Sequence, residues 1–364
     1  MADNRISSVF GAYAEQLQVF VDARLDKFRK TWFPAYFDWG VPAATLSYTT
    51  VIGRQRIEAA ASVVDHGAKA PRRSRTYLEK LAGEVSAIKV ARQMKEADYY
   101  QFLAVQSMRV AEDIKKTQIM KFIWDDLAYC GNAVMDRLDI MVCQALSTGL
   151  ISINTSTNPD GIAPGDIDLL MPAANAVHCA VTWETAHLAT MTPITDIETT
   201  VAAAEIKGIK FEKILMPIVL YRLFSKCTEV LNLMKGWQQV EAGTIKPSLA
   251  KINEYLTENQ LPIIEVVDIV KSIETDGIPA TYRPWDQANI TFVPTGKLGV
   301  IHNTLTVEQI RPVTGVSYAT FNNCLLSKWA QNDPFAEYTQ GELKAFPGVE
   351  AIDSIYIMET DATS

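Results

Sequence analysis

The fold is decided by residues 113–149, which read DIKKTQIMKFIWDDLAYCGNAVMDRLDIMVCQALSTG. Apolar side chains recur there at steps of three and four, which places them on one face of a helix. That face comprises Ile123, Leu127, Cys130, Val134, Leu138, Met141 and Ala145. No proline interrupts the stretch, and Gly149 ends it where a left-handed backbone costs least. We expect one helix of about 36 residues, roughly 54 Å long.

The polar residues of this stretch fall mostly on the other side of the helix, and they include Asp125, Asp126, Asp136, Arg137 and Asp139. A helix of this length exceeds the diameter of a small domain. It must therefore cross an elongated subunit or project from a compact one. The alternative is a long core helix in an α/β enzyme.

Length and composition indicate a folded protein of two or more domains. The chain has 364 residues, 48% of them hydrophobic and 21% charged, with a net charge of −8. This charge argues against a strongly basic nucleic-acid binder. Five scattered cysteines without a CxxC pair are typical of reduced thiols in a cytoplasmic setting. We expect neither a secretory signal nor a membrane-spanning segment.

The N-terminal residues 7–32 have a second helical pattern, which Pro34 ends. Its apolar face carries large side chains, among them Leu17 and Phe20. Such a face needs a partner surface. We expect it either in the core of the same subunit or on a neighbouring chain, and we mark Leu17 and Phe20 as candidate intersubunit contacts.

Residues 53–94 predict a ribbon with a basic tip. A strand is expected at 43–52, strand-like pieces at 56–64 and 84–91, and the tip reads KAPRRSR at 69–75. Residues 69–95 carry a net charge of +6, against −14 for the rest of the chain. A basic ribbon on an acidic subunit suggests docking on another copy through Arg72, Arg73 and Arg75. The alternatives are a solvated loop and a nucleic-acid patch.

The rest of the chain predicts a helix at 95–108 and then mixed helices and strands. Residues 192–300 form a compact α/β region, in which 261–269 is expected to be a central strand. A hairpin is expected around Asp276-Gly277. The other expected strands lie at 150–154, 176–183, 290–294, 315–326 and 348–358. We expect the last of these to return to the sheet of the 192–300 region.

No pattern of catalytic or ligand-binding residues emerges. The four histidines are far apart, and neighbours His178 and Cys179 point to opposite faces of a strand. Two Ser-x-x-Lys pairs, at Ser86 and Ser248, lack the companion motifs of a Ser/Lys nucleophile. Asp166-Ile-Asp168 is read as a turn or helix start. We expect no catalytic, cofactor-binding or metal-binding residues, and hence not an enzyme.

The order of the elements carries more information than any single motif. The distinctive residues, in order, are Thr182-Trp183-Glu184, Thr192-Pro193-Ile194-Thr195-Asp196-Ile197-Glu198, Asp276-Gly277, Pro284-Trp285, Pro294, Gly296-Lys297-Leu298-Gly299, Lys328-Trp329, Asp333-Pro334 and the strand at 352–357. This series resembles the major capsid proteins of tailed bacteriophages, most closely the lambda-type major capsid protein E family. The resemblance runs in order over nearly the whole chain.

The resemblance implies the α+β Hong Kong 97-type capsid fold. Its parts would be an N-terminal arm at 1–52, an E-loop at 53–94, a P-domain and an A-domain. The P-domain would take 95–191 and 300–347, with the spine helix at about 113–149. The A-domain would take 192–299 and 348–358.

The resemblance also implies a major capsid protein that self-assembles into the icosahedral shell around the double-stranded DNA of a tailed phage. Its partners would be further copies in hexamers and pentamers, with possible scaffold, portal and decoration proteins. It would be located in the virion after assembly in the host cytoplasm. It would need no cofactor, touch no membrane and bind DNA without sequence specificity. The alternatives are an encapsulin-like nanocompartment shell and a soluble α/β enzyme.

Overall fold

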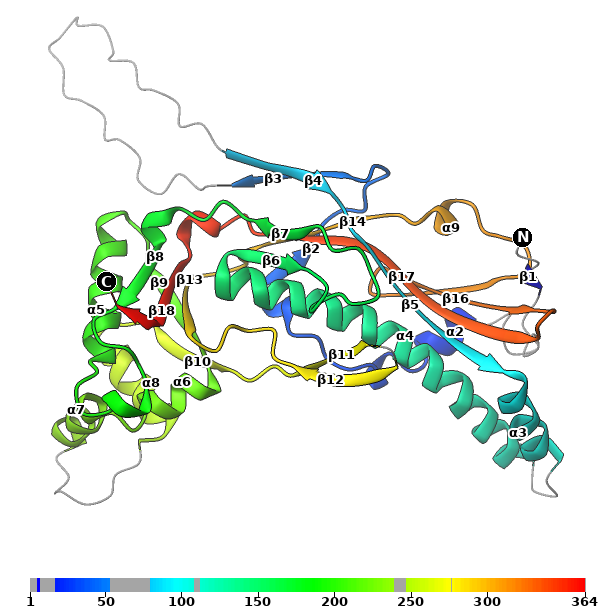
Figure 1. Cartoon of the computed structure of the whole chain (residues 1–364), viewed down its shortest axis with the longest axis horizontal. Coiled ribbons are helices and arrows are strands. Elements are labelled where there is room, and N and C mark those ends of the chain that lie inside the picture. The colour runs from blue at the N-terminus through cyan, green and yellow to red at the C-terminus, as the bar shows by residue number, and fades with distance from the viewer. Residues whose placement is uncertain are drawn as a thin grey trace, which may run out of the picture. The chain divides into compact units, whose positions relative to one another are not determined.

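The computed structural model describes six ranges of the chain, namely residues 5–6, 17–52, 79–107, 112–238, 247–275 and 277–363 (Figure 1). The chain divides into two compact units. Unit 1 comprises Met1–Tyr48, Gly83–Asp139 and Ile301–Pro347. Unit 2 comprises Thr49–Ala82, Ile140–Val300 and Gly348–Ser364.

The expected long helix is confirmed as α4, Glu112–Thr148, which has 37 residues. Its residues up to Asp139 belong to unit 1 and the remainder to unit 2. Gly149 follows with a φ of +71°, the left-handed conformation that ends the helix. The described part of the predicted apolar face is buried, as Leu127, Cys130, Val134, Leu138, Met141 and Ala145 show.

Unit 1 is built on a seven-stranded sheet, in which β1, β16, β17, β14 and β2 follow one another. In addition, β15 pairs with β16 and β5 pairs with β17, both antiparallel. The bounds are Arg5–Ile6 (β1), Phe37–Trp39 (β2), Ala87–Lys95 (β5), Gly299–Thr304 (β14), Ser317–Phe321 (β15), Cys324–Gln331 (β16) and Ala336–Gly348 (β17). Short helices complete the unit: α3 (Glu96–Ser107, as expected), α9 (Val307–Ile310) and the 3-10 turn Phe33–Ala35.

The backbone of helix α4 packs directly against the backbone of β17, with no side chain between them at Gly341. A Cβ atom on Gly341 would lie 2.8 Å from the Cys130 carbonyl oxygen, closer than real contacts allow. The Cys130 thiol donates a hydrogen bond to the Thr339 carbonyl over 3.3 Å. Only glycine at position 341 permits this approach of helix to strand.

The helix expected at 7–32 is confirmed at Leu17–Asp22 but is wrong beyond Asp22. Residues 7–16 lie outside the described ranges, and the described helix is the short α2, Leu17–Asp22, followed by a 3-10 turn at Leu25–Lys27. The backbone then becomes extended at Phe28, whose ring stacks on Phe321 with centroids 3.7 Å apart. The N–H groups of Arg29, Trp32 and Phe33 then bond to side chains of α4 instead of to carbonyls one turn back, which interrupts the helical pattern.

The ribbon is only partly as expected. Strand β3 (Ser47–Ile52) pairs with β4 (Glu79–Glu84), while the expected strand at 56–64 and the basic tip lie outside the described residues. The piece expected at 84–91 as the ribbon's second strand is β5, which instead pairs with β17 in the sheet of unit 1. The alternation of apolar and polar residues correctly predicts a strand here, but it does not predict which strand pairs with it.

Unit 2 contains a five-stranded sheet in the order β10, β9, β13, β18, β8. The bounds are Ala176–Cys179 (β8), Phe211–Pro217 (β9), Ile263–Val267 (β10), Asn289–Pro294 (β13) and Tyr356–Thr363 (β18). The C-terminal strand β18 lies between β13 and β8, which confirms its expected return to this sheet. The core combines sheet residues such as Ile214 and Phe292 with residues of helices α5 (Pro193–Ile206), α6 (Ile218–Phe224), α7 (Thr228–Gln238) and α8 (Leu249–Glu258).

The prediction of a central strand at 261–269 is wrong, because β10 lies at the edge of the sheet. Its free edge is covered by a side chain of α8. The Asn253 amide donates to the Ile264 carbonyl and accepts from the Ile264 N–H, both over 2.9 Å. Asn253 thus replaces the neighbouring strand, and an apolar run that resembles a central strand is accommodated at an edge.

The last turn of α4 is fixed within unit 2 by β13. The Thr291 hydroxyl donates to the Leu146 carbonyl over 2.8 Å, and the Asn289 amide donates to the Ser147 carbonyl over 2.9 Å. Carbonyls at a helix end have no partner within the helix. These two side chains satisfy them and hold the helix end on the sheet.

Unit 2 also carries two isolated hairpins. They are β6 (Leu150–Ile153) with β7 (Gly165–Asp168), and β11 (Lys271–Thr275) with β12 (Ile278–Tyr282). The second is the hairpin expected from the Asp-Gly signal, and Gly277 has the left-handed φ of +79°. In unit 1, by contrast, the strand expected at 315–326 is a hairpin, because Asn322 and Asn323 both take positive φ between β15 and β16.

Candidate functional site

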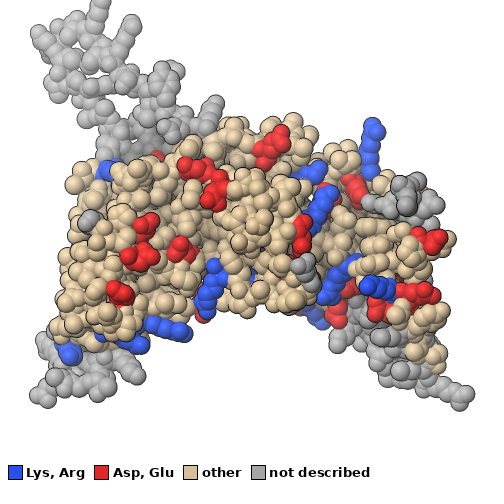
Figure 2. Space-filling model, viewed as in Figure 1, with Lys and Arg blue, Asp and Glu red and all other residues tan. Residues whose placement is uncertain are grey.

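The predicted contact residues fall into two groups. Those that lie outside the described part of the chain, and so remain a prediction, are Arg72, Arg73 and Arg75. Figure 2 shows acidic and basic side chains interspersed over the visible face of the described residues, without a continuous basic stripe there. A nucleic-acid groove would need such a stripe.

Two basic residues of the segment 69–95 are paired inside unit 1. The Lys89 ammonium lies 3.0 Å from a carboxylate oxygen of Glu342. The Arg92 guanidinium lies 3.3 Å from the Asp126 carboxylate and 3.8 Å from the centre of the Tyr129 ring. Part of the positive charge of this segment is therefore balanced within the subunit.

Leu17 and Phe20, the other predicted contacts, are packed inside unit 1. Their exposed fractions are 3% and 9%. The Phe20 ring meets the Trp124 ring edge-on at 5.8 Å, and the Arg24 guanidinium covers it at 4.2 Å. Both side chains are thus largely buried within their own subunit, and their contact with a neighbouring copy stays a prediction. A Leu17→Asp substitution would therefore disturb folding as well as any contact between copies.

In unit 2, the structure brings two resemblance motifs into direct contact. Trp183 lies after β8, and Asp196 lies in the first turn of α5, which begins at Pro193 as expected. The Trp183 indole N–H donates to the Asp196 carboxylate over 3.0 Å, and the Ala180 backbone N–H donates over 3.2 Å. These bonds hold the segment between β8 and α5 against the first turn of α5.

The start of α5 is also held by Glu229 of α7, which sequence reasoning missed. The Ile194 N–H donates to one oxygen of this carboxylate over 2.7 Å, and the Thr195 hydroxyl donates to the other over 2.7 Å. A carboxylate at a helix N-terminus satisfies free N–H groups and complements the helix dipole. No local spacing could reveal the pairing, because Glu229 comes from another helix.

Burial raises the pKa of Asp196 above its ordinary value of 3.8, although the bonds from Trp183 and Ala180 oppose the shift. A carboxyl with a raised pKa binds protons more readily in the folded state than in the unfolded one. Its contribution to stability is therefore full below about pH 3.8 and is lost as the pH rises through the folded-state pKa. At neutral pH the buried carboxylate depends on its two donors.

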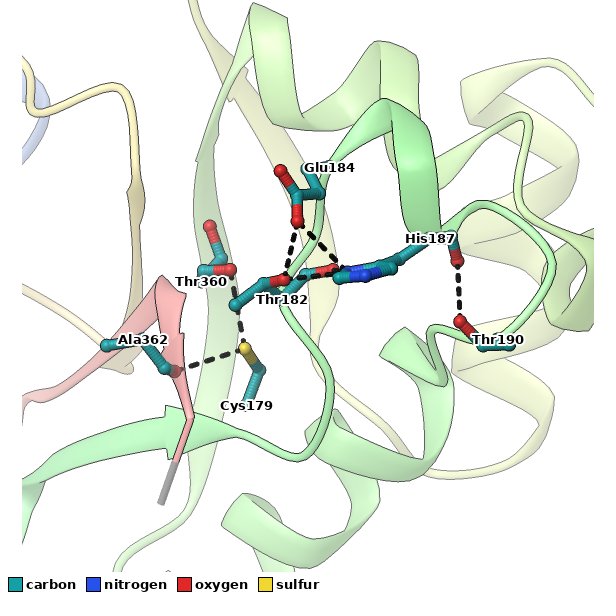
Figure 3. A network of polar contacts seen from close by, with 7 residues as sticks. All are labelled: Cys179, Thr182, Glu184, His187, Thr190, Thr360 and Ala362. Atoms are coloured by element: carbon teal, nitrogen blue, oxygen red, sulfur yellow. Dashed lines mark hydrogen bonds and ion pairs between the residues drawn. The ribbon is translucent and has the colours of Figure 1, made fainter.

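Figure 3 shows the polar network that shapes the loop between β8 and α5. The His187 Nδ1 atom lies 2.8 Å from the Thr182 hydroxyl and 3.1 Å from the Glu184 carboxylate. The Cys179 thiol donates to the Thr360 and Ala362 carbonyls of β18 over 3.3 and 3.4 Å (Figure 3). In a catalytic triad, histidine contacts nucleophile and acid through different nitrogens. Here Nδ1 makes both contacts, so the arrangement fastens a turn.

Replacing Trp183 with phenylalanine is expected to lower the free energy of unfolding by about 1.5–3 kcal/mol at pH 7, because a donor to a buried carboxylate is lost. Phenylalanine keeps an aromatic ring at this buried position next to Phe224, but one smaller than the indole, so the control must lose the same volume. At pH 4 the loss should be smaller, because the raised pKa leaves the carboxyl more protonated there than at pH 7, and the protonated form depends less on the donor. Urea unfolding at both pH values measures the difference.

Trp285→Phe is the matched control. The buried Trp285 indole donates to the neutral Asn289 carbonyl over 3.1 Å. Its loss should cost about 0.5–1.5 kcal/mol and be similar at both pH values. Equal losses for Trp183→Phe at pH 4 and pH 7 would contradict a role in stabilising the Asp196 carboxylate.

The remaining candidate groups have local structural partners. The Ser248 hydroxyl caps α8 by accepting from the Lys251 N–H over 3.5 Å, which accounts for that Ser-x-x-Lys spacing. Asp166 accepts from the Ser152 hydroxyl over 2.6 Å, and Asp168 accepts from the Leu170 N–H over 2.8 Å. The expected turn or helix start at these residues is wrong, because both lie in strand β7, where Asp166 bonds to its cross-strand partner Ser152.

Among the described residues, no group of three or more His, Cys, Asp or Glu side chains is placed to hold a metal ion. None of the described helices is long and apolar enough to cross a membrane. All five cysteines are buried and unpaired with one another. Burial raises the pKa of Cys130 to about 12 and the pKa values of Cys179 and Cys227 to about 11, which keeps these thiols unreactive.

Comparison with known proteins identifies the fold. No protein-family model and no curated protein sequence matches the chain. A solved structure assigned as the capsid protein of a prophage in E. coli CFT073 is 16% identical over 95% of this chain and 98% of that one, with a TM-score of 0.60.

Two further solved structures cover most of the chain with lower scores. A phage-related protein from Bordetella bronchiseptica RB50 is 9% identical over 98% of both chains, with a TM-score of 0.49. The capsid of Myoviridae phage XM1 is 9% identical over 91% of this chain and 92% of that one, with a TM-score of 0.45. The likeness to the prophage structure extends over nearly the full length of both chains. The chain therefore has the α+β Hong Kong 97-type capsid fold.

Proposed function

We propose that this chain is a major capsid protein, which self-assembles into the icosahedral shell that encloses the double-stranded DNA of a tailed phage. The observation that carries the proposal is the full-length likeness to the prophage capsid structure, at a TM-score of 0.60. The continuous 37-residue helix α4 supports it, because a helix of this length is typical of an extended building block.

The parts of the fold take the names that the sequence resemblance implies. Helix α4 would be the spine helix of a P-domain at 95–191 and 300–347. An A-domain at 192–299 and 348–358 would contain β9, β10, β13 and the start of β18, whereas β8 of the same sheet lies in the range of the P-domain. Residues 1–52 form the N-terminal arm and 53–94 the E-loop. The E-loop's boundary at 94 takes in β5, whose pairing with β17 ties that end of the segment to unit 1.

In this role the chain acts through copies of itself and performs no catalysis. Hexamers and pentamers of the subunit close the shell through repeated heterologous contacts, with scaffold, portal and decoration proteins as further partners. The net charge of −8 supports a shell whose inner surface binds DNA only weakly. Affinity for DNA grows with each phosphate that a basic side chain neutralises, and an acidic chain neutralises few of them. The protein is located in the virion.

The test is electron microscopy and sedimentation of the purified full-length chain. Closed icosahedral particles are expected, built from hexamers and pentamers. A monomer or dimer at every concentration would contradict the proposal and favour a soluble enzyme. Particles isolated from the natural source should contain DNA, whereas enzyme cargo would indicate a nanocompartment shell.

Reversing the charge of the ribbon tip is expected to impair shell closure while leaving the subunit folded. The substitutions are Arg72→Glu, Arg73→Glu and Arg75→Glu. If the basic tip docks on the acidic surface of a neighbour, each reversal replaces attraction by repulsion. The fraction of closed particles in negative-stain micrographs should fall about tenfold, because many weak contacts multiply in a shell.

The matched control reverses three exposed basic residues of unit 2, namely Lys210, Arg222 and Lys226. It changes the net charge by the same amount at another place. Normal particles from the tip variant would refute an intersubunit role for the tip. An equal loss from the control would show that total charge, and not the tip, governs assembly.

A further inference from the structure

Two segments of unit 1 that are far apart in sequence are joined by backbone hydrogen bonds. The Gly40 N–H donates to the Ile301 carbonyl over 2.9 Å, and the Ala43 N–H donates to the Asn303 carbonyl over 2.9 Å. The Leu305 N–H returns a bond to the Ala43 carbonyl over 3.1 Å. Residues 40–46 and 301–305 therefore form one fixed surface.

The chain then enters α9, which is held rigidly by a capping box. The Gln309 N–H donates to the Thr306 hydroxyl over 3.2 Å, and the Thr306 N–H donates to the Gln309 side chain over 2.8 Å. Thr306 itself is buried. This arrangement turns Val307 and Ile310, one helical turn apart, to the outside with exposed fractions of 66% and 57%.

Together these segments expose a set of large apolar side chains, which we call the α9 patch. Its members are Val41, Leu305, Val307, Ile310 and Val313. Val41 is 92% exposed, and Val313 is fixed by a bond from its N–H to the Tyr318 hydroxyl over 3.1 Å. Several exposed large apolar side chains on neighbouring segments favour an interaction site. Because the backbone under it is already fixed, covering the patch costs little ordering entropy.

The charges around the α9 patch indicate what covers it. Residues 40–46 contain no charged side chain, and residues 301–314 contain one of each sign, Glu308 and Arg311. The whole chain carries −8, so two copies repel wherever acidic surfaces meet. A neutral apolar patch is a surface at which two copies meet without that repulsion, and it offers little to nucleic acid or to a charged ligand.

We propose that the α9 patch is covered by a second copy of this chain in the assembled shell. The proposal rests on the proposed shell function and adds the surface through which the copies touch. A subunit in a closed shell needs such contacts on several sides. Apolar burial at the α9 patch would supply one of them with a favourable hydrophobic contribution.

The first test compares the double variant Val307→Asp/Ile310→Asp with a control, Ile206→Asp. Ile206 is 84% exposed on α5 in unit 2, so the control places one aspartate, half of the charge that the double variant adds, on an equally open apolar site. All the positions are exposed, so far-UV circular dichroism should be unchanged. The patch variant should form about tenfold fewer closed particles than wild type in sedimentation, because many neighbours are weakened at once. The control should assemble normally.

A second measurement uses Val307→Cys and reaction with a maleimide. The five native cysteines are buried, so the introduced thiol dominates the labelling. It should react readily in dispersed subunits and about tenfold more slowly in closed particles, where a neighbour covers it. Equal labelling in both states would overturn the proposal and leave the patch free for a different protein.

The outcomes separate the two proposals. Wild-type chain that forms no particles contradicts the shell function, and the α9 contact falls with it. Wild-type particles together with normal assembly of the double variant contradict only the α9 contact. The α9 contact is also contradicted if Ile206→Asp reduces particle formation as severely as the patch variant. In that case a charge at any exposed apolar site would disrupt assembly.

Discussion

Asp139→Ala is expected to lower the free energy of unfolding by about 3–6 kcal/mol, the value of two hydrogen bonds to a buried carboxylate. Asp139 of α4 is fully buried and accepts from the backbone N–H groups of Trp32 and Phe33, each over 3.0 Å. Alanine would leave both amides without this acceptor. Urea unfolding monitored by circular dichroism measures the loss.

Asp136→Ala is the control on the same helix. Asp136 is partly exposed, and its partner Arg29, 3.2 Å away, is mostly exposed, so this ion pair should be worth less than about 1 kcal/mol. Asp139→Asn should fall between the two, because the amide keeps an acceptor but loses the charge. If Asp139→Ala and Asp136→Ala cost the same, the N-terminal segment is not held by Asp139.

The hydrogen bonds to Asp139 explain why the apolar pattern at 7–32 wrongly predicts a continuous helix. Apolar spacing reports which side chains are buried, and Leu17, Phe20 and Phe28 are indeed buried. It does not report where the backbone amides find partners. Here the Arg29 N–H donates to Asn132, and the Trp32 and Phe33 N–H groups donate to Asp139, so these amides do not bond to carbonyls one helical turn back. Tertiary acceptors override a marginal helix.

Helix α4, in contrast, is predictable because its local sequence pattern is strong enough to determine the backbone conformation. Its spacing persists over ten turns, so no local alternative competes with it. The same pattern placed Asp139 opposite the apolar face, and only the fold shows that this polar face receives the N-terminal segment. Strand partners were likewise hidden, as with β5 and the edge strand β10. Alternation determines which face is buried but not which strand lies beside it.

The candidate site was predictable only as separate motifs. The resemblance singled out Trp183 and Asp196, and the structure joins them by a hydrogen bond. Glu229, the third member of that arrangement, lies in another helix, so the spacing of residues around α5 cannot predict its contact. The α9 patch had no signal either, because its residues come from two distant segments.

Lys328→Met is expected to cost about 3–5 kcal/mol of unfolding free energy, because it leaves a buried carboxylate without its cation. The Lys328 ammonium lies 3.4 Å from the Glu337 carboxylate, and their side chains are 4% and 0% exposed. The ammonium also donates to the Thr339 hydroxyl over 3.0 Å. All three residues lie on the paired strands β16 and β17 of unit 1.

The double variant Lys328→Met/Glu337→Leu should recover most of this loss. Two buried charges pay a desolvation cost that their attraction only partly offsets, so apolar replacements of similar size are often neutral or stabilising. A double-mutant cycle from urea unfolding gives the coupling between the two positions. A double variant as unstable as the sum of the single variants would contradict a direct coupling.

Lys213→Met supplies the matched control in unit 2. Lys213 and Glu265 also face each other across adjacent strands, 2.9 Å apart, but about a third of each side chain is exposed. Water compensates an exposed charge that loses its partner, so the cost should stay below about 1 kcal/mol. A loss at Lys213 as large as that at Lys328 would mean that burial does not set the strength of these pairs. The small loss expected at Lys213 would show that Lys328 and Glu337 are coupled because the sheet excludes water from them.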